Sequence, residues 1–326
     1  MSLKTELDRV GINPIHNSCS DMVKLLITER CNMQCPFCWN PPARKAELTL
    51  SEVEDLCNKF RDAGMSRIKI CGGAYGEPLL REDIIDVVRT VNNSGFTDIG
   101  LATNGRLLNE SVVQSLIEAG LTWITHSITT LNSSKYQALY GAELSQESLR
   151  AVHSYSGLKR YQVNCVVLSQ HNVDEIDDII DFAHTRGAIV HFMELIGHRD
   201  NWTYFQDNYV SLEPLKAKLF ERCYEHLYSR AKVAHEFRLP TGIVTLKQTD
   251  KEKEGCKFCR RIFVSSEGKI WFCLPENELG DFREVEASSI QDFIDNRYNE
   301  ITELAEKDRL AYGCDRMCDG GVVANE

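Results

Sequence analysis

Eight of the thirteen cysteines in this chain fall into two groups. The first group is Cys31, Cys35 and Cys38, in the string RCNMQCPFC, and the second comprises Cys256, Cys259, Cys273, Cys314 and Cys318. A four-iron cluster takes four ligands, so three closely spaced thiolates leave one iron open to an exogenous ligand. Structural zinc more often uses two CxxC-like pairs. We therefore interpret the first group as an iron–sulfur site.

The other five cysteines occur singly, and each is predicted to be a small buried hydrophobic residue: Cys19, Cys57, Cys71, Cys165 and Cys223. The first residues, MSLKTELDRVGINP, show neither an apolar segment nor an Arg- and Ser-rich amphipathic pattern. This start predicts a cytoplasmic protein. In a reducing compartment, clustered cysteines indicate metal binding or catalysis in preference to disulfides.

The composition excludes several classes of protein. With 43% hydrophobic and 26% charged residues, the 326-residue chain falls in the globular range, which excludes collagen and bulk disorder. No uncharged apolar run approaches the ~20 residues that span a bilayer, so we expect no membrane partner. The net charge of −11 opposes binding to phosphate backbones, so we expect no nucleic acid partner.

Short β-rich segments alternate with helical patterns in the first 195 residues. Thr49 with Glu52 and Asn172 with Glu175 have the spacing of helix capping boxes. Six strand–helix units in series predict parallel strands joined by crossovers, hence an α/β fold with an open sheet or a partial or complete barrel. The predicted strands are Val23–Thr28, Arg67–Cys71, Asp98–Ala102, Leu121–Ser127, Tyr161–Leu168 and Val190–Leu195.

The pattern changes after Leu195. We predict a helix over Leu212–Ala231, a charged linker over Lys247–Gly255 and a helix over Ser289–Glu306. Arg261–Ser265 and Lys269–Phe272 read as a hairpin in which Gly268 supplies a positive φ. The predicted organisation is an N-terminal extension (1–21), a barrel (22–200), a helical connector (201–255) and a C-terminal cysteine-containing module (256–326).

The CxxxCxxC motif after the first strand, with Phe37 directly before the third cysteine, resembles the radical S-adenosylmethionine (SAM) superfamily. The resemblance implies a partial (βα)6 barrel of the TIM type and a [4Fe-4S] cluster whose open iron is chelated by SAM. It also implies reductive cleavage of SAM to a 5′-deoxyadenosyl radical that abstracts hydrogen from a substrate. The electron would come from a flavodoxin- or ferredoxin-type reductant.

The same resemblance assigns SAM contacts at the ends of successive strands. The Gly76-Glu77-Pro78 loop corresponds to the loop that binds the methionine amino group, although such a loop alone could be an ordinary turn. Polar contacts are implied at Thr103, Asn104, Ser127 and Asn164. Glu194 and Arg261 are catalytic candidates, together with His126 and His198, although each of the four by itself is better explained as a structural or solvated residue.

Several strings further resemble the GTP 3′,8-cyclases of molybdenum-cofactor biosynthesis: ITERCNMQCPFC, GEPLLREDI, TNGRLL, HSITTLNSSKY, VNCVVLSQHNVDEIDDIIDFA and FMELI. The likeness resumes at Cys256, Cys259 and Cys273, which implies a second [4Fe-4S] cluster. Cys314 and Cys318 resemble the closing cysteines of twitch or SPASM auxiliary-cluster modules, and one of them would complete the ligand set. A zinc site for the five late cysteines, or free thiols at the last two, remain alternatives.

Three positions depart from the basic residues of that family. Lys24 replaces an Arg, Gln162 replaces a Lys, and Phe263 replaces an Arg while Arg261 remains. The Gly320-Gly321 pair, moreover, is followed by five residues instead of ending the chain. Because a triphosphate needs a clamp of Lys and Arg, these changes predict a small polar substrate other than GTP, such as a nucleoside or sugar derivative.

Three alternatives stay open. One is a peptide-modifying enzyme of the twitch or SPASM type, against which we expect no recognition module before Met22. The second is the GTP cyclase itself, and the third is a non-catalytic metal-binding scaffold. SAM binding distinguishes the scaffold from the enzymes.

Overall fold

The computed structural model describes residues 22–38, 46–72, 76–197, 201–229, 234–248, 261–272 and 278–292. The strands of these segments form one sheet in the order β12-β11-β10-β1-β2-β3-β4-β5-β6-β9-β8-β7. Their bounds are β1 Met22–Leu26, β2 Arg67–Cys71, β3 Asp98–Thr103, β4 Trp123–Ser127, β5 Arg160–Val167, β6 Ile189–Glu194, β7 Glu225–Ser229, β8 Ala234–Leu239, β9 Gly242–Lys247, β10 Arg261–Val264, β11 Lys269–Phe272 and β12 Glu278–Asp281.

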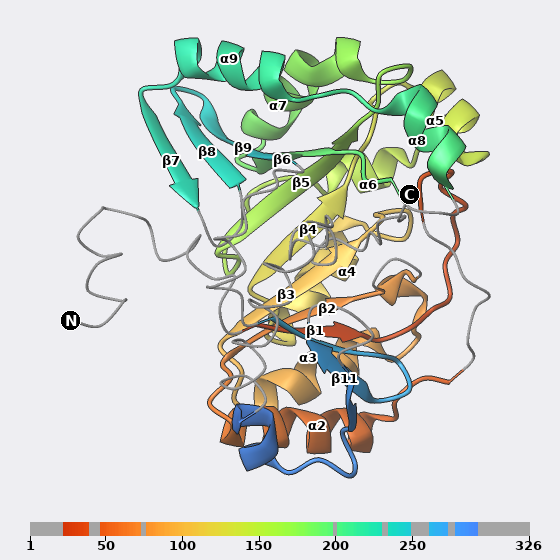
Figure 1. Cartoon of the computed structure of the whole chain (residues 1–326), viewed down its shortest axis with the longest axis vertical. Coiled ribbons are helices and arrows are strands. Elements are labelled where there is room, and N and C mark those ends of the chain that lie inside the picture. The colour runs from red at the N-terminus through yellow and green to blue at the C-terminus, as the bar shows by residue number, and fades with distance from the viewer. Residues whose placement is uncertain are drawn as a thin grey trace, which may run out of the picture.

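The middle of the sheet is parallel, and both of its edges are antiparallel. Every neighbouring pair from β10 through β1–β6 to β9 runs parallel, whereas the β10–β11–β12 and β9–β8–β7 edges are antiparallel. The sheet curves with its helices on the outside and, over the described residues, does not close on itself (Figure 1). The predicted α/β class and partial barrel are confirmed.

Helices and short 3-10 turns connect the strands. They are α2 Leu50–Asp62, η1 Pro78–Leu80, α3 Ile84–Asn93, α4 Glu110–Glu118, α5 Ser133–Tyr140, α6 Gln146–Arg150, η2 Val173–Glu175, α7 Ile176–His184, α8 Trp202–Asn208 and α9 Glu213–Arg222. The predicted capping box of α2 is present. The Thr49 hydroxyl accepts from the Glu52 N–H, and the Glu52 carboxylate accepts from the Thr49 N–H.

Successive side chains of a strand point to opposite faces of the sheet. Leu25, Ile70, Leu101, Ile124 and Tyr161 form one row across five adjacent strands, and all are buried in the main hydrophobic core beneath the helices. The residues between them therefore face the inside of the barrel. This alternation determines which strand residues can reach a site inside it.

The inner face carries a band of cations and aromatic rings near the amino ends of the strands. Lys24, Lys69, Gly100, Trp123 and Arg160 lie in one row. The Arg160 guanidinium is 4.2 Å and the Lys69 Nζ is 5.4 Å from the Trp123 ring centroid. This band occupies the inner face toward the amino ends of the strands. The cavity described below lies at the carboxyl ends of the strands.

The hairpin predicted around Gly268 is confirmed. β10 and β11 pair antiparallel, and Gly268 adopts φ +92° in the turn. A left-handed conformation of this kind favours glycine. The hairpin joins the barrel through parallel pairing of β10 with β1.

The helix predicted over Leu212–Ala231 is too long. α9 ends at Arg222, and residues 225–229 form β7, which pairs with β8. Strand pairing of the whole 225–229 segment overrides its helical pattern, so the expected helical connector contributes three strands to the sheet. Of the predicted linker, Lys247 belongs to β9 and residues 249–255 lie outside the described part. The predicted helix over Ser289–Glu306 is described only to residue 292, and residues 287–292 are helical.

The capping box predicted at Asn172 and Glu175 is wrong. The Asn172 side chain accepts from the Leu168 N–H and donates to the Thr129 carbonyl, and it makes no cap hydrogen bond. Glu175 accepts from the Thr130 hydroxyl at 2.7 Å. Both side chains are buried. They form hydrogen bonds with groups of the loop after β4 instead of with the end of a helix.

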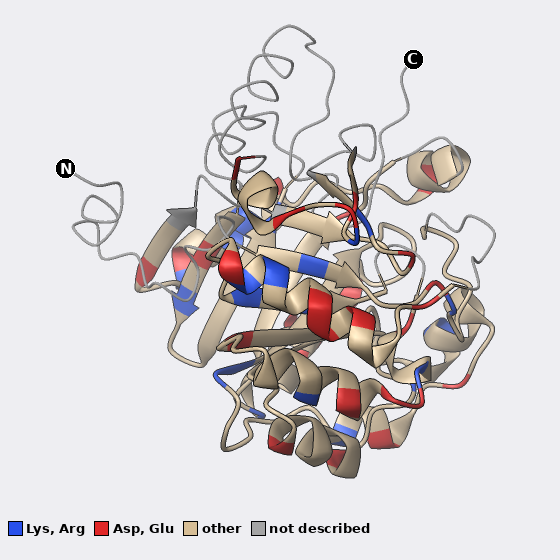
Figure 2. Ribbon diagram, turned by 90° about the horizontal axis from the view of Figure 1, so that it is seen from below, with Lys and Arg blue, Asp and Glu red and all other residues tan. Residues whose placement is uncertain are grey.

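Acidic and basic residues are interspersed along the described helices (Figure 2). Among the helices in the described segments, none combines the length and apolar character needed to cross a membrane.

Candidate functional site

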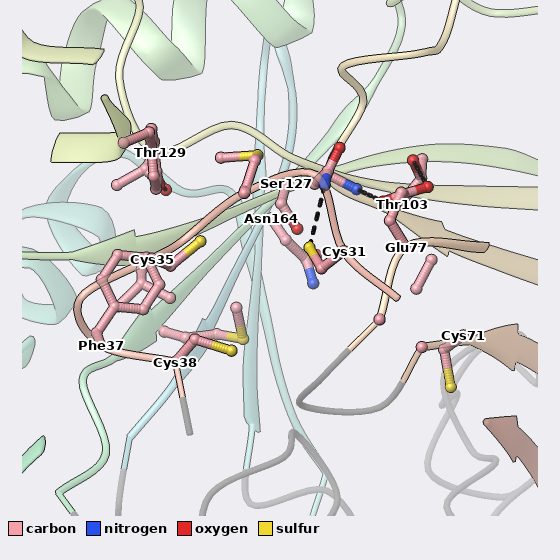
Figure 3. Close-up of a pocket in the computed structure, with 18 of the residues that line it drawn as sticks. Cys31, Cys35, Phe37, Cys38, Cys71, Glu77, Thr103, Ser127, Thr129 and Asn164 are labelled. Atoms are coloured by element: carbon pink, nitrogen blue, oxygen red, sulfur yellow. Dashed lines mark hydrogen bonds between the residues drawn. The ribbon is translucent and has the colours of Figure 1, made fainter. Parts of the chain in front are cut away.

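The three early cysteines lie in the loop that leaves the carboxyl end of β1. They line a cavity of about 200 Å³ together with residues from the ends of β2 to β6 (Figure 3). A turn in which the Cys38 N–H bonds to the Cys35 carbonyl at 3.0 Å brings the second and third cysteines together. Carboxyl ends of parallel strands are where α/β proteins build their sites, so the loop lies where the sequence predicts it.

Contacts with the next segments hold the start of this loop. Arg30 pairs with Glu47 at 2.9 Å, and the Thr28 hydroxyl donates to the same carboxylate at 2.5 Å. The Arg30 carbonyl accepts from the Glu77 N–H at 2.8 Å. The cysteine loop is therefore fixed to the Gly76-Glu77-Pro78 loop through the backbone.

Gly76 is required by close backbone packing. A Cβ on Gly76 would lie 2.0 Å from the Thr28 carbonyl oxygen, and one on Gly72 would lie 1.9 Å from the Gly76 carbonyl oxygen. Gly72 and Gly76 also form an isolated β-bridge. Glycine is thus needed at both positions because two backbone segments pack closely there. This requirement does not depend on a bound ligand.

Glu77 links two loops from beneath the cavity. Its buried carboxylate accepts from the Leu79 N–H at 3.0 Å, the Thr103 hydroxyl at 2.7 Å and the Asn104 N–H at 2.6 Å. Burial raises the pKa of Glu77 to about 6, against the opposing effect of these three donors. Pro78 is buried at the start of η1 and does not belong to the described cavity lining.

Asn104 joins the third strand end to the cysteine loop. Its Nδ2 donates to the Asn32 side chain at 2.8 Å and to the Cys31 sulfur at 3.8 Å. The next residue, Gly105, has φ +80°, and a Cβ there would fall 1.8 Å from His126 Nε2. Backbone conformation and packing both demand glycine at this point.

His126 supports this loop from below. It is buried, and its ring nitrogens contact the Tyr161 hydroxyl at 2.9 Å and the Ser148 hydroxyl at 3.0 Å. Burial lowers the pKa of His126 to about 3. The buried side chain is therefore neutral, which agrees with the structural role that the sequence analysis favours.

Ser127 and Asn164, whose contacts to SAM stay predictions, line the cavity. Glu194 does not, because strand alternation turns its neighbour Met193 toward the cavity and Glu194 to the other face. Its carboxylate is buried and accepts from the Leu212 N–H at 2.9 Å, at the N-cap residue of α9. Glu194 therefore lies outside the described lining, and its catalytic role stays a prediction.

Several predicted site residues lie wholly or partly outside the described structure. Only the backbone of Arg261 is described, paired with Met22, and His198 is not described. The same holds for all five late cysteines: Cys256, Cys259, Cys273, Cys314 and Cys318. The second group therefore remains a prediction.

The cavity is also lined by residues that the sequence analysis did not assign to the site: Met33, Cys71, Gly72, Ala102, Thr129, Tyr136, Tyr140, Val166 and Met193. Strand alternation could have identified Val166 and Met193, because they share a face with Asn164 and lie in paired register. Tyr136 and Tyr140 come from α5, and only its packing over the barrel brings them to the cavity.

The chemistry of the three thiols fits an iron–sulfur cluster. Burial and the charges of the other cysteines raise the pKa of Cys35 to about 12, and burial with the charge of Cys31 raises that of Cys38 to about 11. None of the described residues lining the cavity is Lys, Arg or His, so the lining does not offset three thiolates. Cationic iron would do so.

The three thiols lie in one loop without forming a compact single-ion group in the described structure. Within the described segments, no three Cys, His, Asp or Glu side chains lie close enough together to hold one ion. A four-iron cluster binds each cysteine through a different iron and so needs wider spacing. Three thiols in one loop match the ligand number expected for an iron–sulfur cluster with one open iron.

An open βα barrel with a three-cysteine loop at the carboxyl end of its first strand defines the class of radical enzymes that use an iron–sulfur cluster. A family model described as "Radical SAM superfamily" matches residues 25–183. The chain belongs to the radical SAM superfamily, and it is an enzyme of the kind that uses a [4Fe-4S] cluster and SAM.

Within the superfamily the chain is similar to GTP 3′,8-cyclases. A "Probable GTP 3′,8-cyclase" of Methanothermobacter thermautotrophicus is 30% identical over 274 residues, 81% of this chain and 87% of the relative. A "GTP 3′,8-cyclase" of Alkaliphilus metalliredigens is 31% identical over 279 residues, 81% of this chain and 83% of the relative.

Among solved structures, Streptococcus suis SuiB bound to S-adenosylmethionine has a TM-score of 0.64 at 16% identity, with 98% of this chain and 75% of that chain covered. The structure of anSMEcpe with bound AdoMet has a TM-score of 0.56 at 14% identity, with 94% and 91% covered. At these identities the comparison concerns the fold, and it agrees with the open barrel.

Proposed function

We propose that Cys31, Cys35 and Cys38 hold a [4Fe-4S] cluster, and that the enzyme cleaves SAM there and abstracts hydrogen from a small polar substrate. The proposal is carried by one observation: three thiols and two polar loops line the same cavity. The described lining of this cavity contains no basic residue. The cluster and SAM together would supply a 5′-deoxyadenosyl radical by one-electron reduction. A flavodoxin- or ferredoxin-type protein is the proposed electron source.

The chain's own residues preorganise this cavity. Glu77 holds the loop after β2 against Thr103 and the Asn104 backbone. This leaves the Asn104 side chain to orient the cysteine loop through Asn32. Ser127 and Asn164 supply the polar groups of the opposite wall, which suits a ligand with both polar and apolar parts.

The inner face supports a substrate other than GTP. Phe263 stacks on Trp271 with ring centroids 5.6 Å apart, and Lys24 Nζ lies 5.2 Å from the Phe263 ring. The Gln162 amide donates to Asn164 at 2.7 Å. Two positions that are basic in the cyclases thus carry an aromatic ring and a neutral amide engaged with a cavity residue, which weakens a triphosphate clamp.

We further propose that Cys256, Cys259 and Cys273 bind a second [4Fe-4S] cluster, completed by Cys314 or Cys318. The hairpin β10–β11 supports this proposal, because its strands separate Cys259 from Cys273 and β10 lies beside β1. Because Ile262 pairs with Phe272, the two ends of the described hairpin lie side by side. A fully thiolate-ligated cluster there would carry electrons or shape the substrate pocket.

The first experiment is anaerobic reconstitution of the full chain, followed by iron and sulfide analysis and by assay of 5′-deoxyadenosine after reduction with SAM present. We expect two four-iron clusters. Cys31→Ala/Cys35→Ala/Cys38→Ala should lose one cluster and all SAM cleavage, whereas Cys223→Ser, outside the cavity, should retain both. Formation of 5′-deoxyadenosine by the triple variant would show that the radical centre is elsewhere.

The second cluster has its own test. Cys256→Ala, Cys259→Ala or Cys273→Ala should spare the first cluster and much of the substrate-independent SAM cleavage. Stoichiometric zinc beside a single iron–sulfur cluster in the unsubstituted protein would contradict the proposal for the late cysteines and leave the first cluster standing.

A further inference from the structure

Two asparagines line the described cavity, and their side-chain amides have different partners. Asn104 Nδ2 donates to Asn32 Oδ1 and to the Cys31 sulfur, so its nitrogen bonds inside the protein. The Asn164 oxygen, by contrast, accepts from Gln162 Nε2 at 2.7 Å. Among the described residues, Asn164 Nδ2 bonds to no acceptor. The amide hydrogens of Asn164 are therefore available to whatever occupies the cavity.

Gln162 and Asn164 lie two residues apart on the inner face of β5. Asn164 is in register with Ser127 of β4, and Gln162 lies one step closer to the amino ends of the strands. Ser127 and Asn164 both line the cavity (Figure 3), whereas Gln162 does not belong to the described lining. The hydrogen bond to Asn164 is thus the link between Gln162 and the cavity.

The charges beneath Gln162 favour this direction of the hydrogen bond. Arg160 precedes it on the same face of β5, with its guanidinium 4.2 Å from the Trp123 ring centroid, and Lys69 Nζ lies 5.4 Å from the same ring. Side-chain amide dipoles orient in the field of the protein. Cations on the amino-terminal side attract the carbonyl oxygen of Gln162, and its nitrogen is then turned toward Asn164.

Thr129 gives the same wall the same polarity. Its hydroxyl oxygen accepts from the Tyr140 hydroxyl at 2.6 Å, and Thr129 lines the cavity. A threonine hydroxyl has one hydrogen, and within the described segments that hydrogen bonds to no acceptor. The wall formed by Thr129 and Asn164 therefore offers donors, which suits the part of a ligand that carries acceptor oxygens.

We infer that Gln162 holds Asn164 with its NH2 group turned into the cavity, where this group donates to an oxygen of bound SAM. The inference rests on the proposed function. Gln162 is a positioning residue, because it acts through Asn164 and does not touch the ligand. An acceptor at position 162 would instead take the Asn164 hydrogens and leave the Asn164 oxygen facing the ligand.

The test measures SAM affinity by equilibrium dialysis, with the anaerobically reconstituted full chain and variants matched in iron content. Gln162→Glu replaces the donor with an acceptor, Gln162→Lys keeps a donor, and Gln162→Met has neither. We expect Gln162→Glu to bind SAM about tenfold more weakly, the equivalent of about one hydrogen bond. Gln162→Lys should keep the unsubstituted affinity, and Gln162→Met should fall between the two. Equal affinities of the Glu and Lys variants, or the opposite order, would overturn the inference.

A second comparison separates positioning from the added negative charge. In the background of Asn164→Ala, Gln162→Glu should have no further effect on SAM affinity, because the residue through which it acts is gone. A loss of the same size in this background would show that the carboxylate acts on SAM directly, and the positioning role would be refuted.

A third readout does not need the cluster. In cluster-free protein labelled with nitrogen-15 asparagine, the side-chain amide resonance of Asn164 is identified by its absence from Asn164→Ala. Gln162→Glu should move its proton signal downfield, because the amide then donates to a carboxylate, whereas Gln162→Lys should leave the signal near its original position. An unchanged signal in Gln162→Glu would contradict the inference. Failure of the reconstituted unsubstituted chain to bind SAM would instead refute the proposed function, and the unsubstituted chain alone reveals that outcome.

Discussion

The carboxylate of Glu77 accepts the hydroxyl hydrogen of Thr103 at 2.7 Å, although 26 residues separate them in the chain. The bond is buried and connects the loops after β2 and β3. It fixes one wall of the cavity relative to another before any ligand binds.

We predict that Thr103→Val weakens SAM binding and lowers the free energy of unfolding by about 1.5–3 kcal/mol, since a hydrogen bond to a charged group is lost. Thr103→Ser keeps the hydroxyl and serves as the control. Equilibrium dialysis with SAM and urea unfolding check the two effects. Unchanged SAM affinity in Thr103→Val would show that this bond does not position the cavity wall.

His126 predicts a specific acid sensitivity. Its pKa is lowered from 6.5 to about 3 by burial, so the folded state favours neutral imidazole. The stabilisation is present above the ordinary pKa and is lost as the pH falls from about 6.5 toward 3, at about 1.4 kcal/mol per pH unit.

When the pH falls from 7 to 5, the contribution of His126 should therefore lower the free energy of unfolding by about 2 kcal/mol. His126→Gln, which retains hydrogen-bonding groups for Tyr161 and Ser148, should lose less stability over the same interval. Urea unfolding of both proteins at the two pH values measures the difference. Equal losses would mean that His126 does not stay neutral in the folded protein.

Gly100 and Trp123 form a tight contact on the inner face. A Cβ on Gly100 would lie 2.1 Å from the Trp123 ring. Gly100→Ala should destabilise the protein by about 1–3 kcal/mol through overpacking. In the double variant with Trp123→Leu, the added cost of the alanine should largely disappear, and strictly additive losses would contradict a direct contact.

A substitution at Glu194 can distinguish an effect on folding stability from an effect on catalysis. Glu194→Gln should lower the unfolding free energy by about 1–2 kcal/mol, because a charged acceptor for the Leu212 N–H is replaced by a neutral one. Reconstituted variant protein should still form 5′-deoxyadenosine at the unsubstituted rate. A loss of SAM cleavage in a variant that folds and binds its cluster would return Glu194 to the site.

The chain should not cyclise GTP at micromolar concentrations. Two missing charge-assisted contacts, each worth about 1.5–3 kcal/mol, weaken GTP binding by about a hundredfold or more. Gln162→Lys, alone and with Phe263→Arg, should tighten GTP binding relative to the unsubstituted chain. A cyclised product detected by mass spectrometry with the unsubstituted enzyme would refute this prediction.

Local sequence patterns predicted the order of strands and helices in the first 195 residues, the position of the cysteine loop and the turn at Gly268. These features depend on local periodicity and on residue types with strong conformational preferences. Spacing also identified Cys31, Cys35 and Cys38 as one group, because eight consecutive residues in a single loop stay close in any fold.

Only the tertiary structure decided which side chains meet. Asn172 and Glu175 have the spacing of a capping box, yet burial against the loop after β4 gives them other partners. Glu194 and Met193 are neighbours in sequence, and the pleat of β6 turns them to opposite faces. The ring of Phe37, in the cysteine loop, likewise lies 6.3 Å from that of Tyr204 in α8, 167 positions later, because packing of α8 depends on contacts that local sequence does not encode.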